Sequence, residues 1–117
     1  MIKKIILAAF AVALIAPAQP AQAGESKVLK RIKERGVVNM GHRESSVPFA
    51  YIGKDGKPIG YSMDICNMYV DKIRKVLKMP NIKVKHVPVT SQTRIALMAN
   101  GPIDMECGST TNNLTRQ

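Results

Sequence analysis

Residues 90–113, TSQTRIALMANGPIDMECGSTTNN, contain the elements that decide the fold of this chain. Ser91 occupies an N-cap position, because a serine side chain can accept hydrogen bonds from the free amides of a first helical turn. Apolar side chains follow at helical spacing until Asn100-Gly101 ends the run. Residues 103–107 then alternate apolar and acidic side chains, as a strand with one buried face does. The stretch predicts a helix and a strand, followed by a polar loop at the strand end where ligands bind in open α/β sheets.

Arg94 is the cation of this stretch and lies in the first turn of the predicted helix. A cation there opposes the helix dipole, which favours anions at that end by about 0.3–1 kcal/mol. Helix stability therefore does not explain this arginine. A small anion would benefit from Arg94, the helix amides and the hydroxyls of Ser91, Ser109 and Thr111. A solvated surface arginine is the alternative, and the pattern alone does not choose between the two.

The first 23 residues have the pattern of a secretory signal peptide. A basic head with Lys3 and Lys4 precedes an apolar run over residues 5–15, and Ala21-Gln22-Ala23 matches the small-x-small cleavage pattern. The apolar run is too short to span a bilayer. We expect cleavage after Ala23 and export of residues 24–117.

The chain is basic, with a formal net charge of +10, which falls to +8 when the two signal-peptide lysines leave. The charges concentrate in residues 27–35 and 72–85. A basic surface steers anionic ligands or an acidic partner, although solvated polar faces account for most of these charges. With 4% aromatic residues and no nucleic-acid motif, we expect no nucleic-acid partner. No zinc or redox spacing is present, and we expect neither metal nor cofactor.

The two cysteines, Cys66 on a predicted helix and Cys107 on the predicted strand, allow one disulfide in an exported chain. Such a bond requires the two Cα atoms to lie within about 7 Å, which the sequence does not show. Two buried free thiols, or pairing with a cysteine outside this chain, are equal alternatives.

Upstream of residue 90 the same local signals predict a regular alternation of elements. A helix over residues 26–35 ends at Gly36, and a short apolar strand follows over residues 37–41. Asp55-Gly56 predicts a hairpin turn between residues 49–52 and 59–61.

The next predicted helix is capped by Ser62 and is followed by a strand over residues 82–89. Its apolar side chains recur at helical spacing: Ile65, Met68, Tyr69, Ile73, Val76 and Leu77. Strands that alternate with helices indicate an α/β fold, with a mostly parallel sheet and helices on both faces.

In a parallel sheet the residues that follow each strand meet at one edge. These residues include Arg43 after the first strand, Ser91 and Arg94 after the next, and residues 109–113 after the last. Two guanidinium groups suit a ligand with two carboxylates, since each can bind one carboxylate through two hydrogen bonds.

Three stretches carry a resemblance to a known family: GHRESSVPFAYI, PVTSQTRIALMANGPIDMECGSTTNN and the terminal LTRQ. The chain resembles the periplasmic glutamate/aspartate-binding proteins of ABC uptake systems, within the family 3 extracellular solute-binding proteins. The resemblance covers residues 26–117, and HRESS and ECGSTTNN are its most specific parts. It implies a type II periplasmic-binding-protein fold with two lobes, which closes on one amino acid in the periplasm and docks as a monomer on membrane permease subunits.

The resemblance also assigns roles to the candidate site. Arg94 would hold the α-carboxylate of the ligand, and Arg43 would hold the side-chain carboxylate of L-glutamate or L-aspartate. Ser91, Ser109 and Thr111 would add hydrogen bonds. Because family members are well over twice this long, the resemblance implies that residues 24–117 are the first lobe, cut near the first crossover, with the second lobe absent and the site incomplete.

Two other functions are compatible with the same fold. A ligand-sensing module of a membrane receptor would need a transmembrane segment after the lobe. A periplasmic dehydratase would need an acid–base pair, and neither a nucleophile elbow nor a zinc signature is present among His42, His86, Glu44 and their neighbours. We expect no catalysis, and we expect structural hydrogen bonding from Asp104 and Glu106.

Overall fold

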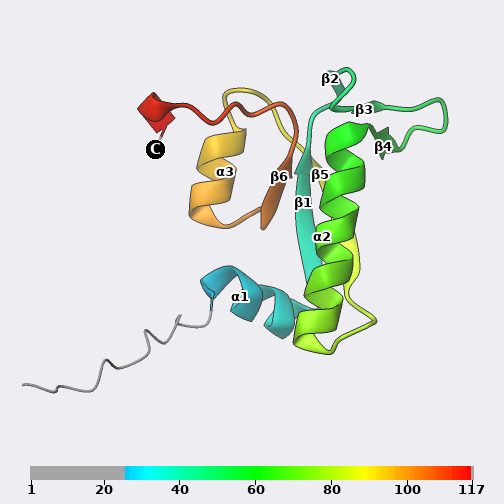
Figure 1. Ribbon diagram of the computed structural model, residues 1–117, viewed down its shortest axis with the longest axis vertical. Coiled ribbons are helices and arrows are strands. Elements are labelled where there is room, and N and C mark those ends of the chain that lie inside the picture. The colour runs from blue at the N-terminus through cyan, green and yellow to red at the C-terminus, as the bar shows by residue number, and fades with distance from the viewer. Residues whose placement is uncertain (1–25, 117) are drawn as a thin grey trace, which may run out of the picture.

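Three parallel strands form the centre of the computed structural model, which describes residues 26–116 (Figure 1). Strand β1 (Val37–His42) lies between β5 (Lys83–Pro88) and β6 (Met105–Cys107). The register pairs the last residue of β1 with the last residue of β5 and the last of β6, so the strands end at one level. The predicted parallel sheet is confirmed. The predicted signal peptide, residues 1–23, lies outside the described residues.

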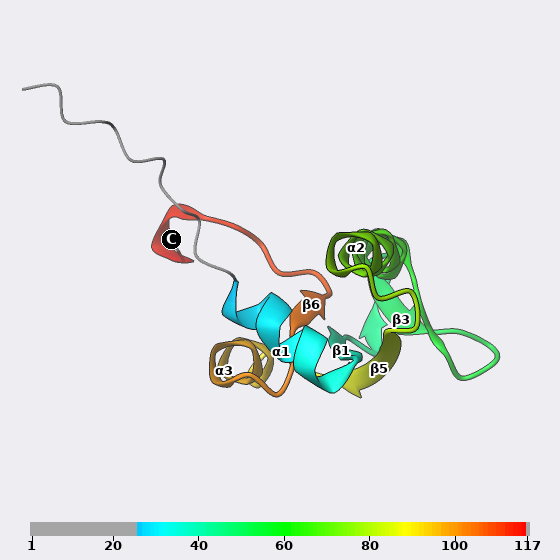
Figure 2. The same ribbon diagram turned by 90° about the horizontal axis from the view of Figure 1, so that it is seen from below.

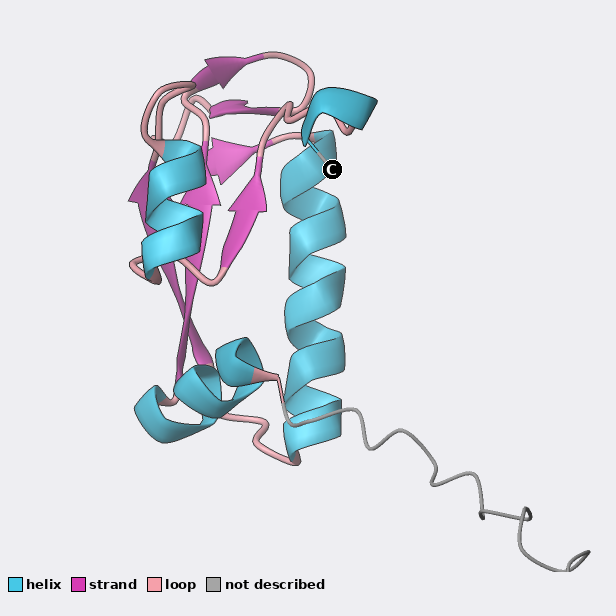
Figure 3. Cartoon of the chain, turned by 90° about the vertical axis from the view of Figure 1, so that its left-hand side faces the viewer, coloured by secondary structure: helices cyan, strands magenta, loops and turns pink. Residues whose placement is uncertain are grey.

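Helices cover both faces of this sheet, as predicted. Helix α2 (Tyr61–Leu77) packs on one face and α3 (Arg94–Asn100) on the other (Figures 2 and 3). Helix α1 (Lys27–Arg35) lies at the end of the sheet where β1 begins, and a 3₁₀ turn, η1 (Leu114–Arg116), follows β6. Gly36 ends α1 with φ +65°, a left-handed conformation that costs glycine little.

The core lies between α2 and the sheet. Its buried members are apolar side chains from α1, α2 and the strands, together with both cysteines: Ile32, Val38, Met40, Ala50, Met63, Cys66, Val70, Ile82 and Cys107. Removing such side chains from water is the main favourable term in folding.

A buried carboxylate, that of Asp104, bonds to β1 just before β6 begins. The Asp104 side chain is fully buried and accepts hydrogen bonds from Arg35 Nη2 at 2.6 and 2.7 Å and from the Asn39 amide at 2.9 Å. The carboxylate therefore takes the place of a ladder partner for β1 and ties α1 to the sheet. The structural role predicted for Asp104 is confirmed.

A second, antiparallel sheet sits beyond the end of β1. It contains β2 (Ser45–Ser46), which was not predicted, β3 (Ala50–Ile52) and β4 (Pro58–Ile59), in that order. The Asp55-Gly56 hairpin is confirmed, with Gly56 at φ +75°. Its second strand is shorter than predicted, because Gly60 at φ +127° turns the chain directly into α2 at Tyr61.

Two predictions about α2 are wrong. Ser62 does not cap the helix, because the first amides donate to the carbonyls of Pro48 and Phe49 at 2.9 and 2.8 Å. The buried face also differs from the predicted stripe, since Met63, Cys66 and Val70 are buried. Three residues of the predicted stripe are largely exposed instead: Met68, Tyr69 and Val76. Apolar residues occur on more than one side of this helix, so spacing alone did not fix which side faces the sheet.

Candidate functional site

The candidate site lies at the edge where the three parallel strands end. The hydrogen bonding between β1 and β5 extends one residue past the end of β5, because the Val89 amide donates to the His42 carbonyl at 2.9 Å. Arg43 follows β1, residues 89–94 follow β5, and residues 108–112 follow β6. The register therefore brings together the three segments that the sequence placed at one edge.

Arg43 and Ser91 meet across this edge. Arg43 Nη1 donates a hydrogen bond to Ser91 Oγ at 2.8 Å. The predicted N-cap role of Ser91 is wrong, because Thr90 and Thr93 close the turn before α3 by exchanging backbone-to-hydroxyl hydrogen bonds of 3.0 and 3.2 Å. The Ser91 hydroxyl is thereby left to hold the arginine, and α3 begins at Arg94.

Arg94 is buried at the start of α3, with 8% of its surface exposed. Its Nε and Nη1 atoms are buried and have no hydrogen-bond partner among the described residues. Buried polar groups without hydrogen-bond partners are costly, and each one calls for an explanation such as a role in binding an anion. The alternative of a solvated surface arginine is wrong.

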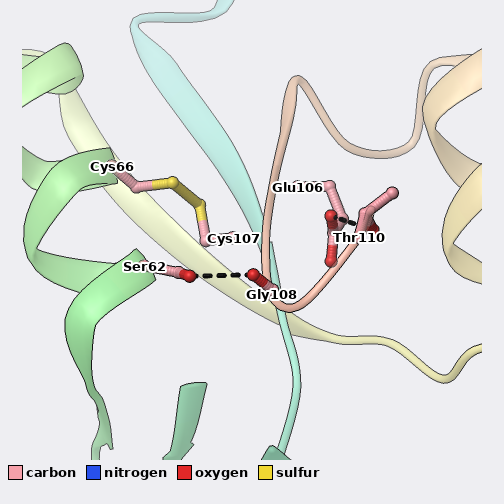
Figure 4. Close-up of a disulfide and its surroundings, with 6 residues drawn as sticks. All are labelled: Ser62, Cys66, Glu106, Cys107, Gly108 and Thr110. Carbon is pink, nitrogen blue, oxygen red and sulfur yellow. Dashed lines mark hydrogen bonds between the residues drawn. A yellow bond between two sulfur atoms is a disulfide. The ribbon is translucent and has the colours of Figure 1, made fainter. Parts of the chain in front are cut away.

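The loop after β6 is fastened to α2 by two bonds (Figure 4). Cys66 and Cys107 form a disulfide with Cα atoms 6.2 Å apart, and Ser62 Oγ donates to the Gly108 carbonyl at 2.8 Å. The described residues contain no free cysteine. The segment that carries Ser109 therefore starts from a fixed point on the core.

The remaining hydroxyls of the predicted site lie on this loop. Ser109 is half-buried and Thr111 is exposed. A hollow of about 410 Å³ lies between the loop and the start of α3, lined by Ile95, Thr110, Thr111 and Asn112. Its volume is within the range of small-molecule sites, which is about 300–1,000 Å³.

Glu106 belongs to the site, although the sequence suggested only structural hydrogen bonding. Its Oε2 accepts a hydrogen bond from Thr110 Oγ1 at 2.6 Å (Figure 4). Its Oε1 lies 3.9 Å from Arg94 Nη1. The signal that could have found it is the alternation along β6, which directs Glu106 away from Cys107 and hence away from α2.

Two of the residues considered for catalysis, His42 and His86, have neighbouring rings. His42 is buried, with Nδ1 3.2 Å from the Arg43 carbonyl, and its ring centroid is 6.0 Å from that of His86. Burial, with a smaller contribution from His42, lowers the pKa of His86. Within residues 26–116 there is no cluster of three metal-ligating side chains and no helix long and apolar enough to cross a membrane.

Solved solute-binding proteins share this fold, and the described residues are part of one lobe of the type II periplasmic-binding-protein fold. The chain belongs to the bacterial extracellular solute-binding proteins, family 3, which its residues 38–117 match.

Two curated relatives cover most of the chain. An L-glutamate/L-aspartate-binding protein of Pseudomonas aeruginosa (strain PAO1) is 54% identical over 90 residues, which are 76% of this chain and 30% of that protein. A glutamate/aspartate import solute-binding protein of Escherichia coli (strain K12) is 47% identical over 112 residues, which are 96% of this chain and 37% of that protein. The chain thus spans about a third of the length of these relatives.

One solved structure with this fold is an enzyme by name. An ancestral cyclohexadienyl dehydratase superposes with a TM-score of 0.60 and 27% identity, over 80% of this chain and 36% of that one. The two curated relatives are binding proteins by name. Because the fold is shared by binding proteins and an enzyme, the absence of catalysis stays a prediction.

Proposed function

We propose that this chain contributes to the capture of an acidic amino acid, L-glutamate or L-aspartate, in the periplasm, for delivery to the permease of an ABC importer. The observation that carries the proposal is the pair of arginines at one sheet edge. Arg43 is held by Ser91, and Arg94 is buried with two nitrogens that have no hydrogen-bond partner among the described residues. The named functions of the two relatives support the same ligand class.

The two arginines are proposed to have separate roles. Arg94, with the start of α3 behind it, holds the α-carboxylate that every amino acid carries. Arg43, which is more exposed, holds the side-chain carboxylate, and Ser91, Ser109 and Thr111 donate hydrogen bonds to the ligand. Charge-assisted hydrogen bonds of this kind are roughly twice as strong as neutral ones, and paired Arg–carboxylate bonds add directional specificity.

The organisation of the protein is part of the proposal. Residues 1–23 act as a cleaved signal peptide, and residues 24–117 form the first lobe of a two-lobed binding protein that acts as a monomer. Groups that meet the ligand amine are then supplied by a second lobe. On this proposal the protein binds the ligand and releases it chemically unchanged.

Isothermal calorimetry of residues 24–117 with L-glutamate, L-aspartate and L-glutamine tests the proposal, with circular dichroism on the same sample. L-Glutamine matches L-glutamate in shape and lacks only the side-chain charge. We expect heat from the acids and little from L-glutamine. A folded sample that binds neither acid, or that binds all three equally, would refute acidic-ligand capture by this chain.

Two variants separate the arginine roles. Arg43→Ala is expected to weaken the binding of L-glutamate by about ten- to hundredfold, as the loss of a charge-assisted hydrogen bond does. The free energy of unfolding should change little. Arg94→Ala is expected to abolish binding of every amino acid tested. Unchanged L-glutamate affinity in Arg43→Ala, or retained binding in Arg94→Ala, would remove that residue from its role.

A further inference from the structure

The Glu106 carboxylate is the point at which α3 and the loop after β6 meet. Its side chain is 13% exposed, one oxygen accepts from Thr110 Oγ1, and the other faces Arg94 Nη1 at 3.9 Å. Among the described residues, Glu106 is the only carboxylate within 4.0 Å of the Arg94 guanidinium. The two segments of the proposed site are therefore coupled through this one side chain.

Arg94 and Glu106 each offer the hydrogen-bonding group that the other lacks. Glu106 Oε1 and Arg94 Nη1 are both buried and both lack a hydrogen-bond partner among the described residues. A charge-assisted N–H···O bond is about 2.7–2.9 Å long, so a movement of about 1 Å would satisfy both atoms together. At the present separation, the attraction of opposite charges on two largely buried side chains holds the guanidinium toward the carboxylate.

Gly108 shows how closely the loop wraps around this carboxylate. A Cβ atom at Gly108 would collide with Glu106 Oε1 and would lie 2.8 Å from Arg43 Cγ. Both neighbours are side-chain atoms, so a side chain at this position would displace Glu106 or Arg43. The Glu106 carboxylate thus lies near the aliphatic part of Arg43 as well as beside Arg94 Nη1.

We propose that Glu106 is a positioning residue, which aligns the Arg94 guanidinium for the ligand α-carboxylate and ties the Thr110 loop to it. This inference rests on the proposed function for the identity of the ligand. The pairing of Glu106 with Arg94 does not depend on any ligand. A guanidinium that is already aligned loses less freedom when the ligand binds, which raises affinity without a new contact to the ligand.

The competing explanation is that Glu106 only balances the charge of the arginines. It predicts the opposite change in the affinity for acidic ligands when Glu106 is neutralised. Arg43, Arg94 and Glu106 together carry one net positive charge, which complements the one net negative charge of L-glutamate or L-aspartate. If Glu106 supplied charge only, its neutralisation would leave more positive charge in the site and tighten acidic ligands. If it positions Arg94, its neutralisation weakens them.

The test is Glu106→Gln in the full chain, with Asp71→Asn as a matched control. Glutamine keeps the shape and can still accept from Thr110, whereas Asp71 is an exposed carboxylate paired with Arg74. Without ligand, the Arg94 Nε–Hε resonance is followed by ¹⁵N NMR and is identified by its loss in Arg94→Lys. We expect Glu106→Gln to shift this resonance and Asp71→Asn to leave it in place.

With ligand, calorimetry is expected to show about ten- to hundredfold weaker binding of L-glutamate and of L-aspartate in Glu106→Gln, by the same factor for both. An unmoved Arg94 resonance, or tighter binding of the acids, would overturn the proposal. Failure of the wild-type chain to bind either acid would refute the proposed function instead, because the resonance is measured without ligand.

A second variant keeps the test decisive if Glu106→Gln does not fold. Thr110→Val removes the 2.6 Å bond to Glu106 Oε2 and leaves both charges in place. The carboxylate then loses one of its two contacts, so we expect a smaller shift of the Arg94 resonance and weaker binding of both acids. An Arg94 resonance identical to that of the wild type would overturn the proposal.

Discussion

The Cys66–Cys107 bond is expected to supply a large share of the stability of this lobe. It joins residues 41 apart in sequence, from the middle of α2 to the end of β6. In the chain-entropy account, closing a loop of about 40 residues removes roughly 13 cal/mol/K from the unfolded chain, which is about 4 kcal/mol at 25 °C. Domains of this size are stable by only about 5–15 kcal/mol in total. Loss of the bond should therefore leave the lobe with about 1–11 kcal/mol of stability.

Urea unfolding followed by circular dichroism measures this contribution in the double variant Cys66→Ala/Cys107→Ala. With a slope of about 1–2 kcal/mol/M, a loss of 4 kcal/mol lowers the midpoint by roughly 2–4 M. The control is the wild-type chain with its disulfide reduced, which keeps both sulfur atoms in the core. It separates the effect of the crosslink from that of the cavity left by two alanines. A loss below about 1 kcal/mol in both samples would refute the reasoning.

Two further predictions concern the buried Asp104 carboxylate and the titration of His86. Asp104→Ala removes the acceptor of the Asn39 amide and of an α1 guanidinium, so we expect a loss of about 3 kcal/mol in urea unfolding. The exposed Asp71→Asn should cost less than about 0.5 kcal/mol, and equal small losses would contradict this account. Because burial and His42 lower the pKa of His86 below 6.5, the unfolded chain binds the proton more readily and stability falls as pH drops below that value. In His86→Gln the thermal midpoint should depend less on pH between about pH 5 and 7. An unchanged pH dependence would assign the effect to other groups.

The element order and the parallel sheet were predictable because their signals are local. A glycine that needs a positive φ ends α1 at Gly36, and Asp55-Gly56 makes the hairpin turn. Alternation of strands and helices then leaves the strands parallel, which places Arg43, Arg94 and Ser109 at one edge. Each step requires only a few neighbouring residues or the order of elements.

The roles that were not predictable depend on residues distant in sequence. Ser62 looked like a cap, but distant backbone carbonyls satisfy the first amides of α2 and free its hydroxyl for Gly108, 46 residues away. Ser91 looked like a cap for the same reason, but the neighbouring threonines close that turn. Glu106 alternated with apolar residues as a solvent-facing side chain would, and only the position of α3 against β6 shows that it meets Arg94. Local propensity names a residue type for a position, and tertiary contacts then decide its partner.

The parts of the proposed site are held with unequal firmness, and this inequality matches their proposed roles. The loop after β6 is fixed to α2 by a disulfide and by the bond from Ser62, and Arg94 is buried against Glu106. Arg43 donates a hydrogen bond to the exposed Ser91. A feature common to all amino acids needs a fixed partner, whereas side-chain carboxylates at different distances need one that can move. The rigid side of the edge therefore suits recognition of the α-carboxylate, and the adaptable side suits acceptance of both L-glutamate and L-aspartate.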